Sequence, residues 1–573
     1  MSRHCAERLP RCPETGSDGR GAATMTRMGE PSTGKKPAGM TLRELLAVDE
    51  RAGAVPAQDS VAVVDHETAT AVAGITVTGL QLDSRRVEPG DLYLALRGAQ
   101  THGLHFAANA IDRGAVAVAI DADDSSSMDA ATLATLEALR AQDFPVVDVL
   151  ALASRAASLA TRLHGHPDRL LTLVAVTGTD GKTSVCRFIA DALERLGTPC
   201  GYIGTLGWGR GDELSATQLT TPDAPALIGM LAALRDRGAV AVALEASSHG
   251  LATGRLDRLD LDVAVLTNLG RDHLDFHGDE ASYRRAKARL FAWPSLSSVV
   301  LNGDDGFGRE LADELAENRP ELAQFVYGLS TGKAAPVNTT IGRADAATQR
   351  TGILAADVQP TSRGLSFTLI DGGVHHRLES PLVGRFNVDN LLACHGVMRA
   401  LDVAATDAAN VLATLKPVPG RMERFTAHER PTVVVDYAHT PQALVAALGA
   451  AREHCKGELW VVFGCGGDRD RGKRAPMGRA AERADRIVVT DDNPRSEASA
   501  DIIAAVLAGM HDPALATVIA DRAVAIAHAV AAARAEDVVL IAGKGHEDYQ
   551  IVGDQRLSLS DRHCVTALLA EAG

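Results

Sequence analysis

The chain has 573 residues, of which 46% are hydrophobic and 23% are charged, so it has an ordinary folded composition but is too long for one core. Its formal net charge of −15 and its aromatic content of 3% argue against a broad basic, base-stacking surface, and we expect no nucleic-acid partner. No apolar run reaches the roughly 18 residues that a membrane-spanning helix needs, so we expect no membrane span.

The beginning of the chain differs in composition from the rest. Residues 1–39 are rich in Gly, Pro, Ser, Arg and Lys and lack the apolar stretch of a signal peptide. We predict that they form a disordered extension or an over-predicted start, and that removing them leaves activity unchanged. The eight cysteines are scattered without a Cys-x-x-Cys pair, which is typical of reduced thiols in a cytoplasmic protein.

The first predicted domain covers residues 40–147 and has the pattern of a small α/β unit. The stretch ITVTGLQLDSRRVEPGDLYLALRG predicts strands, and HFAANAIDRGAVAVAI predicts a helix followed by a strand. A helix in ASRAASLATRLHGHP, ended by Gly165 and Pro167, then leads into the second domain, which we assign to residues 148–418. Its apolar strands each end in polar residues, and a β-rich stretch follows at about residues 326–382.

The second domain opens with VAVTGTDGKTSVCRFI, residues 174–189, which runs from a strand pattern through a glycine-rich loop into a helix pattern. Backbone N–H groups of such a loop bind phosphate, a lysine adds positive charge, and a hydroxyl reaches Mg²⁺. The usual pattern has another glycine at the place of Val176, so this loop is of a shorter kind. We predict that ATP is bound by Gly178, Thr179, Asp180, Gly181, Lys182, Thr183 and Ser184.

Other charged residues follow the later strands of this domain. Glu245 ends an apolar strand, where a carboxylate can hold Mg²⁺ or can be a helix cap or a salt-bridge partner. The next strand is followed by Asp272, His273, Asp275 and His277. Spacing alone does not choose among these four, which are either ligands or solvated loop side chains. Lys287, in YRRAKARLF, has the pattern of a solvated helix face.

The third predicted domain covers residues 419–573 and is Rossmann-like. Its strands lie in PTVVVDYAH, ELWVVFGCGGDRD, DRIVVTDDNPR and DVVLIAGKGHEDY, and helices alternate with them, which predicts a mostly parallel sheet. Ligands of such sheets bind beyond the carboxyl ends of the strands, so the charged motifs should meet in one crevice. Arg469, Asp492 and Arg495 are then either a structural ion-pair network or a site for a zwitterionic ligand, with His546 and Glu547 on the same rim.

Nine motifs together resemble those of the Mur ligases, over roughly residues 40–573. They are TGTDGKT, LEASSHGL, TNLGRDHLDFHG, GRFNVDN, VPGRME, DYAHTP, FGCGGDRD, DDNPR and GKGHED. The family's own phosphate loop is the shorter T-G-T-N-G-K-T, with Asn where this chain has Asp180. The resemblance implies a three-domain α/β ligase of the branch that adds the third residue of the peptidoglycan stem peptide, acting in the cytoplasm.

The resemblance also implies the ligands and their residues. UDP-MurNAc-L-Ala-D-Glu would be held by Leu82, Ser84, Thr220, Thr221, Ser247, Thr253 and Arg255. Mg²⁺ would be held by Thr183, Glu245, His273 and Lys287, the last as a carbamate (N6-carboxylysine). These last three residues and Lys182 would form the catalytic set. Asn387 and Asn390 would face the adenine of ATP, while Arg421 and Asp436 would close over the nucleotide.

The third-domain charges suggest meso-diaminopimelate as the amino acid. Arg495 can bind its distal carboxylate through a two-donor fork, and Pro494 stiffens that turn. Asp492 and Glu547 can take the neighbouring ammonium group. The set is completed by Asn493 as a neutral hydrogen-bonding group, Arg469 for the other carboxylate, and Gly543.

The implied reaction transfers the γ-phosphoryl group of ATP to the D-Glu side-chain carboxylate, and the amine then attacks the acyl phosphate. Three alternatives remain open. One is the same enzyme using L-lysine. Another is a folylpolyglutamate synthase, which would lack LDSRRVEPGDLYLALRG and DDNPR, and the third is a nucleotide-binding scaffold without turnover. We expect a monomer.

Overall fold

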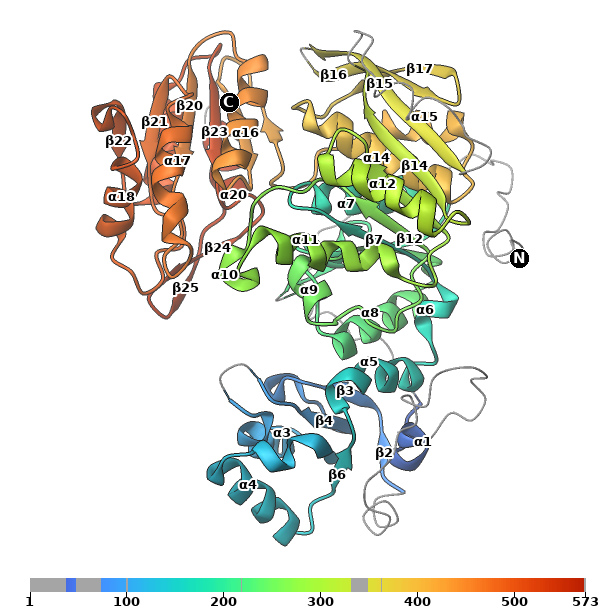
Figure 1. Cartoon of the computed structure of the whole chain (residues 1–573). Coiled ribbons are helices and arrows are strands. Elements are labelled where there is room, and N and C mark those ends of the chain that lie inside the picture. Colours follow the sequence, from blue (N-terminus) through green and yellow to red (C-terminus); the bar gives the residue numbers. More distant parts are fainter. Residues whose placement is uncertain are drawn as a thin grey trace, which may run out of the picture. The chain divides into compact units, whose positions relative to one another are not determined.

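Figure 1 shows a computed structural model that describes residues 38–47, 74–98, 101–217, 219–330, 349–361 and 363–570. The predicted extension, residues 1–39, lies outside these ranges except for its last two residues. The chain forms two compact units, the first made of Met1–Thr177, Gly197–Ala264 and Ala281–Ser297 and the second of the remaining segments. None of the described helices is long and apolar enough to span a bilayer. Every cysteine in the described ranges is a free thiol.

The first unit begins with a small parallel sheet in the order β3-β4-β5-β6, next to the short antiparallel pair of β1 and β2. Its strands are β1 (Met40–Thr41), β2 (Thr76–Val77), β3 (Gly79–Gln81), β4 (Asp91–Ala95), β5 (Ala117–Asp121) and β6 (Val146–Val149). Its helical segments are α1 (Leu42–Leu46), η2 (Ser84–Arg86), η3 (Gly103–Phe106), α3 (Ala107–Asp112), η4 (Ala122–Ser127), α4 (Ala130–Ala141) and α5 (Leu152–Leu163). Strands β4 and β5 are buried along their whole length, as expected for the middle of a parallel sheet.

The first unit continues with part of the central domain. Its strands run in the order β10-β9-β8-β11-β7, with β8, β11 and β7 parallel to one another. The elements are α6 (Pro167–Leu170), β7 (Thr172–Thr177), β8 (Cys200–Gly204), β9 (Gly207–Arg210), β10 (Glu213–Ser215), α8 (Ala224–Asp236), β11 (Ala241–Glu245), α9 (Ser248–Ala252), β12 (Val263–Leu266), α11 (Glu280–Ala288) and η5 (Arg289–Ala292). Helix α8 starts where Asp223 caps it and Pro225 fixes its first turn, two features typical of helix N-termini.

The second unit contains the phosphate loop, helix α7 and a sheet that ends in a long antiparallel meander. Strands β13, β14 and β15 are parallel, and β15, β16 and β17 are antiparallel. The elements are α7 (Lys182–Arg195), α10 (Leu274–His277), β13 (Ser298–Asn302), α12 (Gly306–Asn318), β14 (Ala323–Leu329), β15 (Arg350–Thr361), β16 (Gly364–Asp371), β17 (Val374–Ser380), α14 (Phe386–Ala400) and α15 (Ala405–Leu412). The β-rich stretch that the sequence predicts at about residues 326–382 is this meander.

The C-terminal part of the second unit is a sheet in the order β18-β19-β23-β20-β21-β22, parallel except for β18. Helices α16, α17 and α18 pack on one face and α19 and α20 on the other (Figure 1). The strands are β18 (Glu423–Phe425), β19 (Thr432–Asp436), β20 (Leu459–Phe463), β21 (Arg486–Val489), β22 (Ala516–Val518), β23 (Val538–Ala542), β24 (Tyr549–Val552) and β25 (Gln555–Ser558). The helical segments are α16 (Pro441–Glu453), η6 (Arg471–Lys473), α17 (Arg474–Ala481), α18 (Ser499–Leu507), η7 (Pro513–Leu515), α19 (Arg522–Ala532) and α20 (Asp561–Ala570).

The predicted α/β class is therefore confirmed, with a small parallel N-terminal sheet, a mostly parallel central region and a Rossmann-like C-terminal sheet. The four charged motifs of the last domain follow β19, β20, β21 and β23, which are neighbours in one sheet. The exact domain boundaries stay a prediction.

Candidate functional site

The phosphate loop is held in shape by the segment that follows β12. Thr179 N–H donates to Asn268 O at 2.9 Å, Asp180 N–H donates to Asn268 Oδ1 at 3.0 Å, and Thr267 Oγ1 donates to Asp180 O at 2.6 Å. A Cβ on Gly178, whose φ is +150°, would lie 1.8 Å from Thr267 Oγ1, so only glycine fits this close approach. The loop is thus a rigid turn that presents its backbone at the start of α7.

The charged and hydroxyl groups of the loop are close to each other within the second unit. Lys182 Nζ donates to the carbonyl oxygens of Gly178 and Thr179, both at 2.8 Å, so the ammonium lies along the loop. Thr183 is buried, and its Oγ1 accepts a hydrogen bond from Arg421 Nη2 at 3.3 Å. Arg421, which is predicted to bind ATP, therefore lies next to the Thr183 hydroxyl of the phosphate loop.

Three other residues predicted for the nucleotide lie on α14 and at the end of β19. Asn387 and Asn390 are buried on α14, and Asp436 is the partly buried last residue of β19. Asn390 Nδ2 donates to Asn387 Oδ1 at 3.0 Å, and Asn390 Oδ1 lies 2.6 Å from where a Cβ on Gly181 would be. Asp436 accepts hydrogen bonds from the N–H groups of Met422 and Ala438. Burial raises the pKa of Asp436, and Arg421 together with these N–H groups opposes that shift.

In the first unit, Glu245 lies at the end of β11 with only 1% of its surface exposed. Its Oε1 accepts from Tyr202 Oη at 2.7 Å and from Thr205 N–H at 2.9 Å, and its Oε2 accepts from Thr205 Oγ1 at 3.1 Å. The interpretation of Glu245 as a helix cap or a salt-bridge partner receives no support from these contacts. Sequence reasoning missed Tyr202 and Thr205, because neither residue type in a strand or turn signals a role in orienting a carboxylate.

The two remaining predicted metal ligands differ in exposure. Lys287 is 1% exposed, with Nζ 4.5 Å from the centre of the Tyr283 ring, so the sequence pattern of a solvated helix face was wrong. The periodicity of α11 is uninformative because charged residues stand both before and after the buried Lys287 in the sequence. His273 has 46% of its side chain exposed and lies 3.3 Å from Asp272 Oδ2, in a left-handed backbone conformation.

Three of the four predicted donors, the Thr183 hydroxyl, the Glu245 carboxylate and the carbamate on Lys287, are oxygen groups of the kind that Mg²⁺ prefers, whereas His273 offers a nitrogen. Among the residues that the structure describes, no three His, Cys, Asp or Glu side chains cluster as a metal site. The predicted set also includes the Thr183 hydroxyl and a carbamate. The carbamate exists only after Lys287 is modified.

Most of the residues predicted for the UDP-sugar peptide form one network in the first unit. Thr221 Oγ1 donates to the backbone oxygen of Glu245 at 2.7 Å and contacts Ser247 Oγ at 2.9 Å, and Arg255 donates to Thr221 O at 2.8 Å. Thr220 Oγ1 lies 3.1 Å from Thr205 Oγ1. The pKa of Arg255 is lowered by burial, an effect that Asp223 partly opposes.

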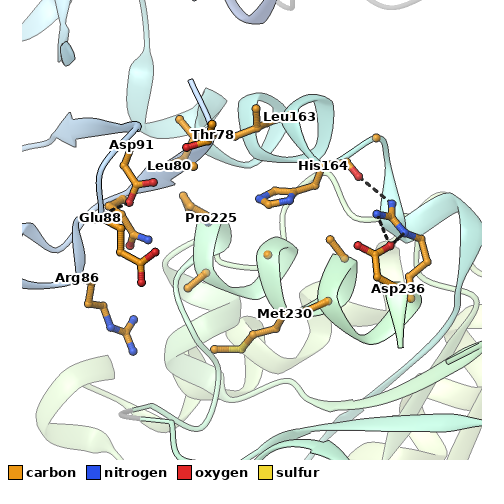
Figure 2. A pocket seen from close by; sticks show the side chains of 18 of the residues that line it. Thr78, Leu80, Arg86, Glu88, Asp91, Leu163, His164, Pro225, Met230 and Asp236 are labelled. Carbon is orange, nitrogen blue, oxygen red and sulfur yellow. Dashed lines mark hydrogen bonds and ion pairs between the residues drawn. The ribbon is translucent and has the colours of Figure 1, made fainter. Parts of the chain in front are cut away.

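The last three predicted UDP-sugar residues lie outside this network. Ser84 is buried in η2, Leu82 precedes it, and Thr253 is exposed at the end of α9 with its hydroxyl bonded to His249 O. A separate pocket of about 720 Å³ lies beside this region, between the edge strand β3 and helix α8 (Figure 2). Arg86 reaches to 3.8 Å from Asp223 at its rim. None of the seven predicted UDP-sugar residues lines this pocket.

The amino-acid end of the predicted site lies beyond β21 and β23 in the second unit. Asn493 Nδ2 donates to Glu547 Oε2 at 3.1 Å, and both side chains surround Lys544 Nζ. Asp492 Oδ1 is buried and has no hydrogen-bond partner in the described part of the chain. Gly543 has a φ of +116° and a Cβ position 3.3 Å from Asp492 Oδ2, so the backbone here comes close to the carboxylate.

The two predicted arginines flank Gly466. Its Cβ position lies 2.9 Å from Arg495 Nη1 and 3.8 Å from Arg469 Cγ. Arg495 has a φ of +54°, donates through Nη1 to Gly467 O at 2.7 Å, and joins the β24–β25 hairpin through Ile551 O. Pro494 precedes it in the buried turn. The contacts that hold Arg495 in this turn are thus hydrogen bonds to backbone oxygens, and its role as a ligand-binding group stays a prediction.

Comparison with known proteins places these motifs in one family. The chain matches the models "Mur ligase family, catalytic domain" at residues 76–161, "Mur ligase middle domain" at 176–398 and "Mur ligase, glutamate ligase domain" at 420–545. It is 45% identical over 492 residues to a UDP-N-acetylmuramoyl-L-alanyl-D-glutamate–2,6-diaminopimelate ligase of Ectopseudomonas mendocina, covering 86% of this chain and 94% of that one. The protein of the same name from Pseudomonas aeruginosa is 46% identical, with 85% and 94% covered.

A solved structure of a protein with this same name is 34% identical, with a TM-score of 0.59, and the match covers 87% of this chain and 96% of that one. The family models together cover most of the chain, in the order of the 4-, 11- and 6-stranded sheets of the described residues. The chain therefore belongs to the Mur ligase family.

Proposed function

We propose that the chain is an ATP-dependent, ADP-forming ligase that adds meso-diaminopimelate to the D-Glu side-chain carboxylate of UDP-MurNAc-L-Ala-D-Glu. The observation that carries the choice of amino acid is the grouping of Asp492, Asn493 and Glu547 near a turn that contains Arg495. The names of the similar proteins support the same substrate pair. The reaction would belong to peptidoglycan precursor synthesis, and we propose that it takes place in the cytoplasm, where ATP and UDP-sugars are available.

The chemistry needs activation of a carboxylate, because hydroxide is too poor a leaving group for amide formation at neutral pH. The carboxylate oxygen attacks the γ-phosphorus, the bond from that phosphorus to the β–γ bridging oxygen breaks, and ADP leaves. The free amine of the amino acid then attacks the acyl carbon, loses a proton, and expels inorganic phosphate. Lys182 is the cation of the phosphate loop and would offset the charge of the two anions that meet in the first step.

Thr183, Glu245, His273 and Lys287 as a carbamate would hold Mg²⁺, which supplies charge neutralisation of the phosphates. Glu245 is suited to such a role because Tyr202 and Thr205 fix the direction of its carboxylate. Thr221, Ser247 and Arg255 would hold the sugar-peptide, and Thr221 links this group to the backbone of Glu245. Asn387, Asn390, Arg421 and Asp436 would bind the nucleotide.

The selection of diaminopimelate over lysine follows from one additional carboxylate at the far end of the chain. Arg495 has one Nη1 donor directed at a backbone oxygen, and the rest of its fork is available to a planar carboxylate. Lysine would leave this cation desolvated without a counter-ion, at a cost of about 2–5 kcal/mol. That range corresponds to roughly a 30- to several-thousand-fold preference.

The test is ADP release by the full chain with UDP-MurNAc-L-Ala-D-Glu, ATP and either amino acid. Arg495→Ala should lose the preference for diaminopimelate, whereas Arg479→Ala, at an exposed position on α17, should keep it. Equal use of lysine and diaminopimelate by the wild type would favour the lysine-adding alternative. ADP release that does not depend on either amino acid would favour a protein without ligase turnover.

A further inference from the structure

Lys544 is an ammonium group buried in the amino-acid end of the C-terminal sheet. It lies two residues after the end of β23 and has no exposed surface, which makes it one of the largest fully buried side chains of the described chain. A lysine at such a position is costly unless its charge is paired and its N–H groups are bonded. The apolar strand before it offers no group that could pair with a cation, so its charge must be balanced by side chains from other segments.

Those partners are the polar groups proposed to receive the substrate's ammonium. Lys544 Nζ lies 3.1 Å from Glu547 Oε2, 3.2 Å from Asn493 Oδ1 and 3.6 Å from Asp492 Oδ1. The Tyr549 ring lies below it, with its centre 5.5 Å from Nζ. One ammonium thus lies between two carboxylates. Arg522, Tyr437 and Tyr549 also act on these carboxylates, but Arg522 is paired with Asp561 and the two tyrosines are phenols, so the group has one net negative charge.

The amide of Asn493 is fully committed inside this group. Its Oδ1 accepts from Lys544 Nζ and from Ile551 N–H at 2.9 Å, and its Nδ2 donates to Glu547 Oε2. Its orientation is therefore fixed, and its oxygen has little capacity left for an incoming ammonium group. The acceptor left over is Asp492 Oδ1, which is buried without a hydrogen bond in the described residues.

We infer that Lys544 is a positioning residue that sets the charge and geometry of the diaminopimelate subsite, an inference that rests on the proposed function. Its ammonium lies within 3.6 Å of the Asp492 and 3.1 Å of the Glu547 carboxylate, offsets one of their two negative charges, and leaves a net charge that one substrate ammonium neutralises. It also fixes Asn493, so that Asp492 is the group that faces the substrate.

Loss of this ammonium has a definite electrostatic consequence. Without this ammonium the buried Asp492 carboxylate and the partly buried Glu547 carboxylate repel each other, so one of them holds a proton more readily. The subsite of a Lys544→Met variant should therefore bind the substrate ammonium poorly at neutral pH and better as the pH rises. A residue that only fills space would produce no such pH dependence.

The experiment compares the wild type, Lys544→Met, Lys544→Met/Glu547→Gln and the exposed control Lys456→Met, all as full chains. KM is measured for each substrate between pH 6 and pH 9. Lys544→Met should raise KM for diaminopimelate by about 30-fold or more at pH 7, with a smaller rise at pH 9, and change KM for ATP by less than about threefold. The double variant again has one net negative charge, and should have a lower KM for diaminopimelate than Lys544→Met.

Several results would overturn the inference. They are an unchanged KM for diaminopimelate, an equal rise in KM for all substrates, a rise that does not depend on pH, or a double variant worse than the single one. If Lys544→Met fails to fold and the double variant folds, the charge argument is supported; if neither folds, Lys544 is a packing residue. A wild type that prefers lysine would refute the proposed substrate, and the same comparison would then be made with lysine, whose ammonium tests Lys544 independently.

Discussion

Replacing Asp561 by Asn should destabilise the C-terminal sheet domain by about 3–5 kcal/mol, the cost typical of breaking a buried ion pair. Asp561 and Arg522 both have side chains with no exposed surface, and they form two bonds of 2.7 Å. The substitution removes the negative charge and leaves the guanidinium buried. Arg522 also donates to the backbone oxygens of Ala542 and Asp491, the residues just before Gly543 and Asp492.

Urea unfolding of the full chain measures this loss of stability if the fluorescence signal comes from the C-terminal sheet domain. Trp460 on β20 packs in the same cluster as α19 and α20, so a Trp208→Phe/Trp293→Phe background makes its fluorescence report on this domain. The exposed Asp554→Asn serves as the matched control. Arg522→Met/Asp561→Leu should recover most of the stability, because apolar side chains of similar volume replace the whole pair. A loss below about 1 kcal/mol in Asp561→Asn, or a double variant no more stable than the single one, would refute the reasoning.

Three further predictions concern Asp180 of the phosphate loop, Lys287, and the carboxyl group of Asp389 on α14. Asp180→Asn should keep activity and lower KM for ATP, because the negative charge of Asp180 repels the phosphates. The same charge raises the pKa of Asp436. Abolished turnover in the variant would show an active role for Asp180. Lys287→Ala should reduce ADP release severely, and short carboxylic acids should restore part of the rate, whereas near-normal activity would contradict a ligand role. Burial, together with Asp304, raises the pKa of Asp389 to about 7, so the folded state binds a proton there and loses stability as pH rises from about 4 to about 7. Asp389→Asn should therefore melt higher than wild type at pH 8 with a gain that shrinks toward pH 5, and a constant difference between the two pH values would contradict this account.

Much of the fold could be predicted from the sequence because apolar strands and Ala-rich helices alternate regularly. The charged motifs after β19, β20, β21 and β23 do lie at neighbouring strand ends, as parallel topology requires. The phosphate loop could be predicted because its backbone needs positive φ angles at two positions, and the sequence has Gly178 and Gly181 there. These are local or topological rules, and a single sequence carries them.

Burial of individual polar side chains could not be predicted in the same way. Lys287 lies in α11, where charged residues occur on several sides of the helix. The spacing of apolar residues in α11 therefore does not reveal which face packs inward. Lys544 follows an apolar strand and looks like the start of a loop, yet its side chain is enclosed by groups from the segment after β21 and the segment before β24. Tyr202 on β8 and Thr205 in the turn after it orient Glu245 on β11, a contact that arises only when the sheet assembles.

The substrate preference is the central claim, and one assay tests it most directly. Purified full chain is given ATP, Mg²⁺ and UDP-MurNAc-L-Ala-D-Glu with either meso-diaminopimelate or L-lysine, and kcat/KM is measured from ADP release and from the UDP-tripeptide formed. The account predicts that diaminopimelate is used at least about 30-fold better, from the cost of leaving Arg495 unpaired. Equal or better use of lysine, or ADP release without a UDP-tripeptide product, would contradict it.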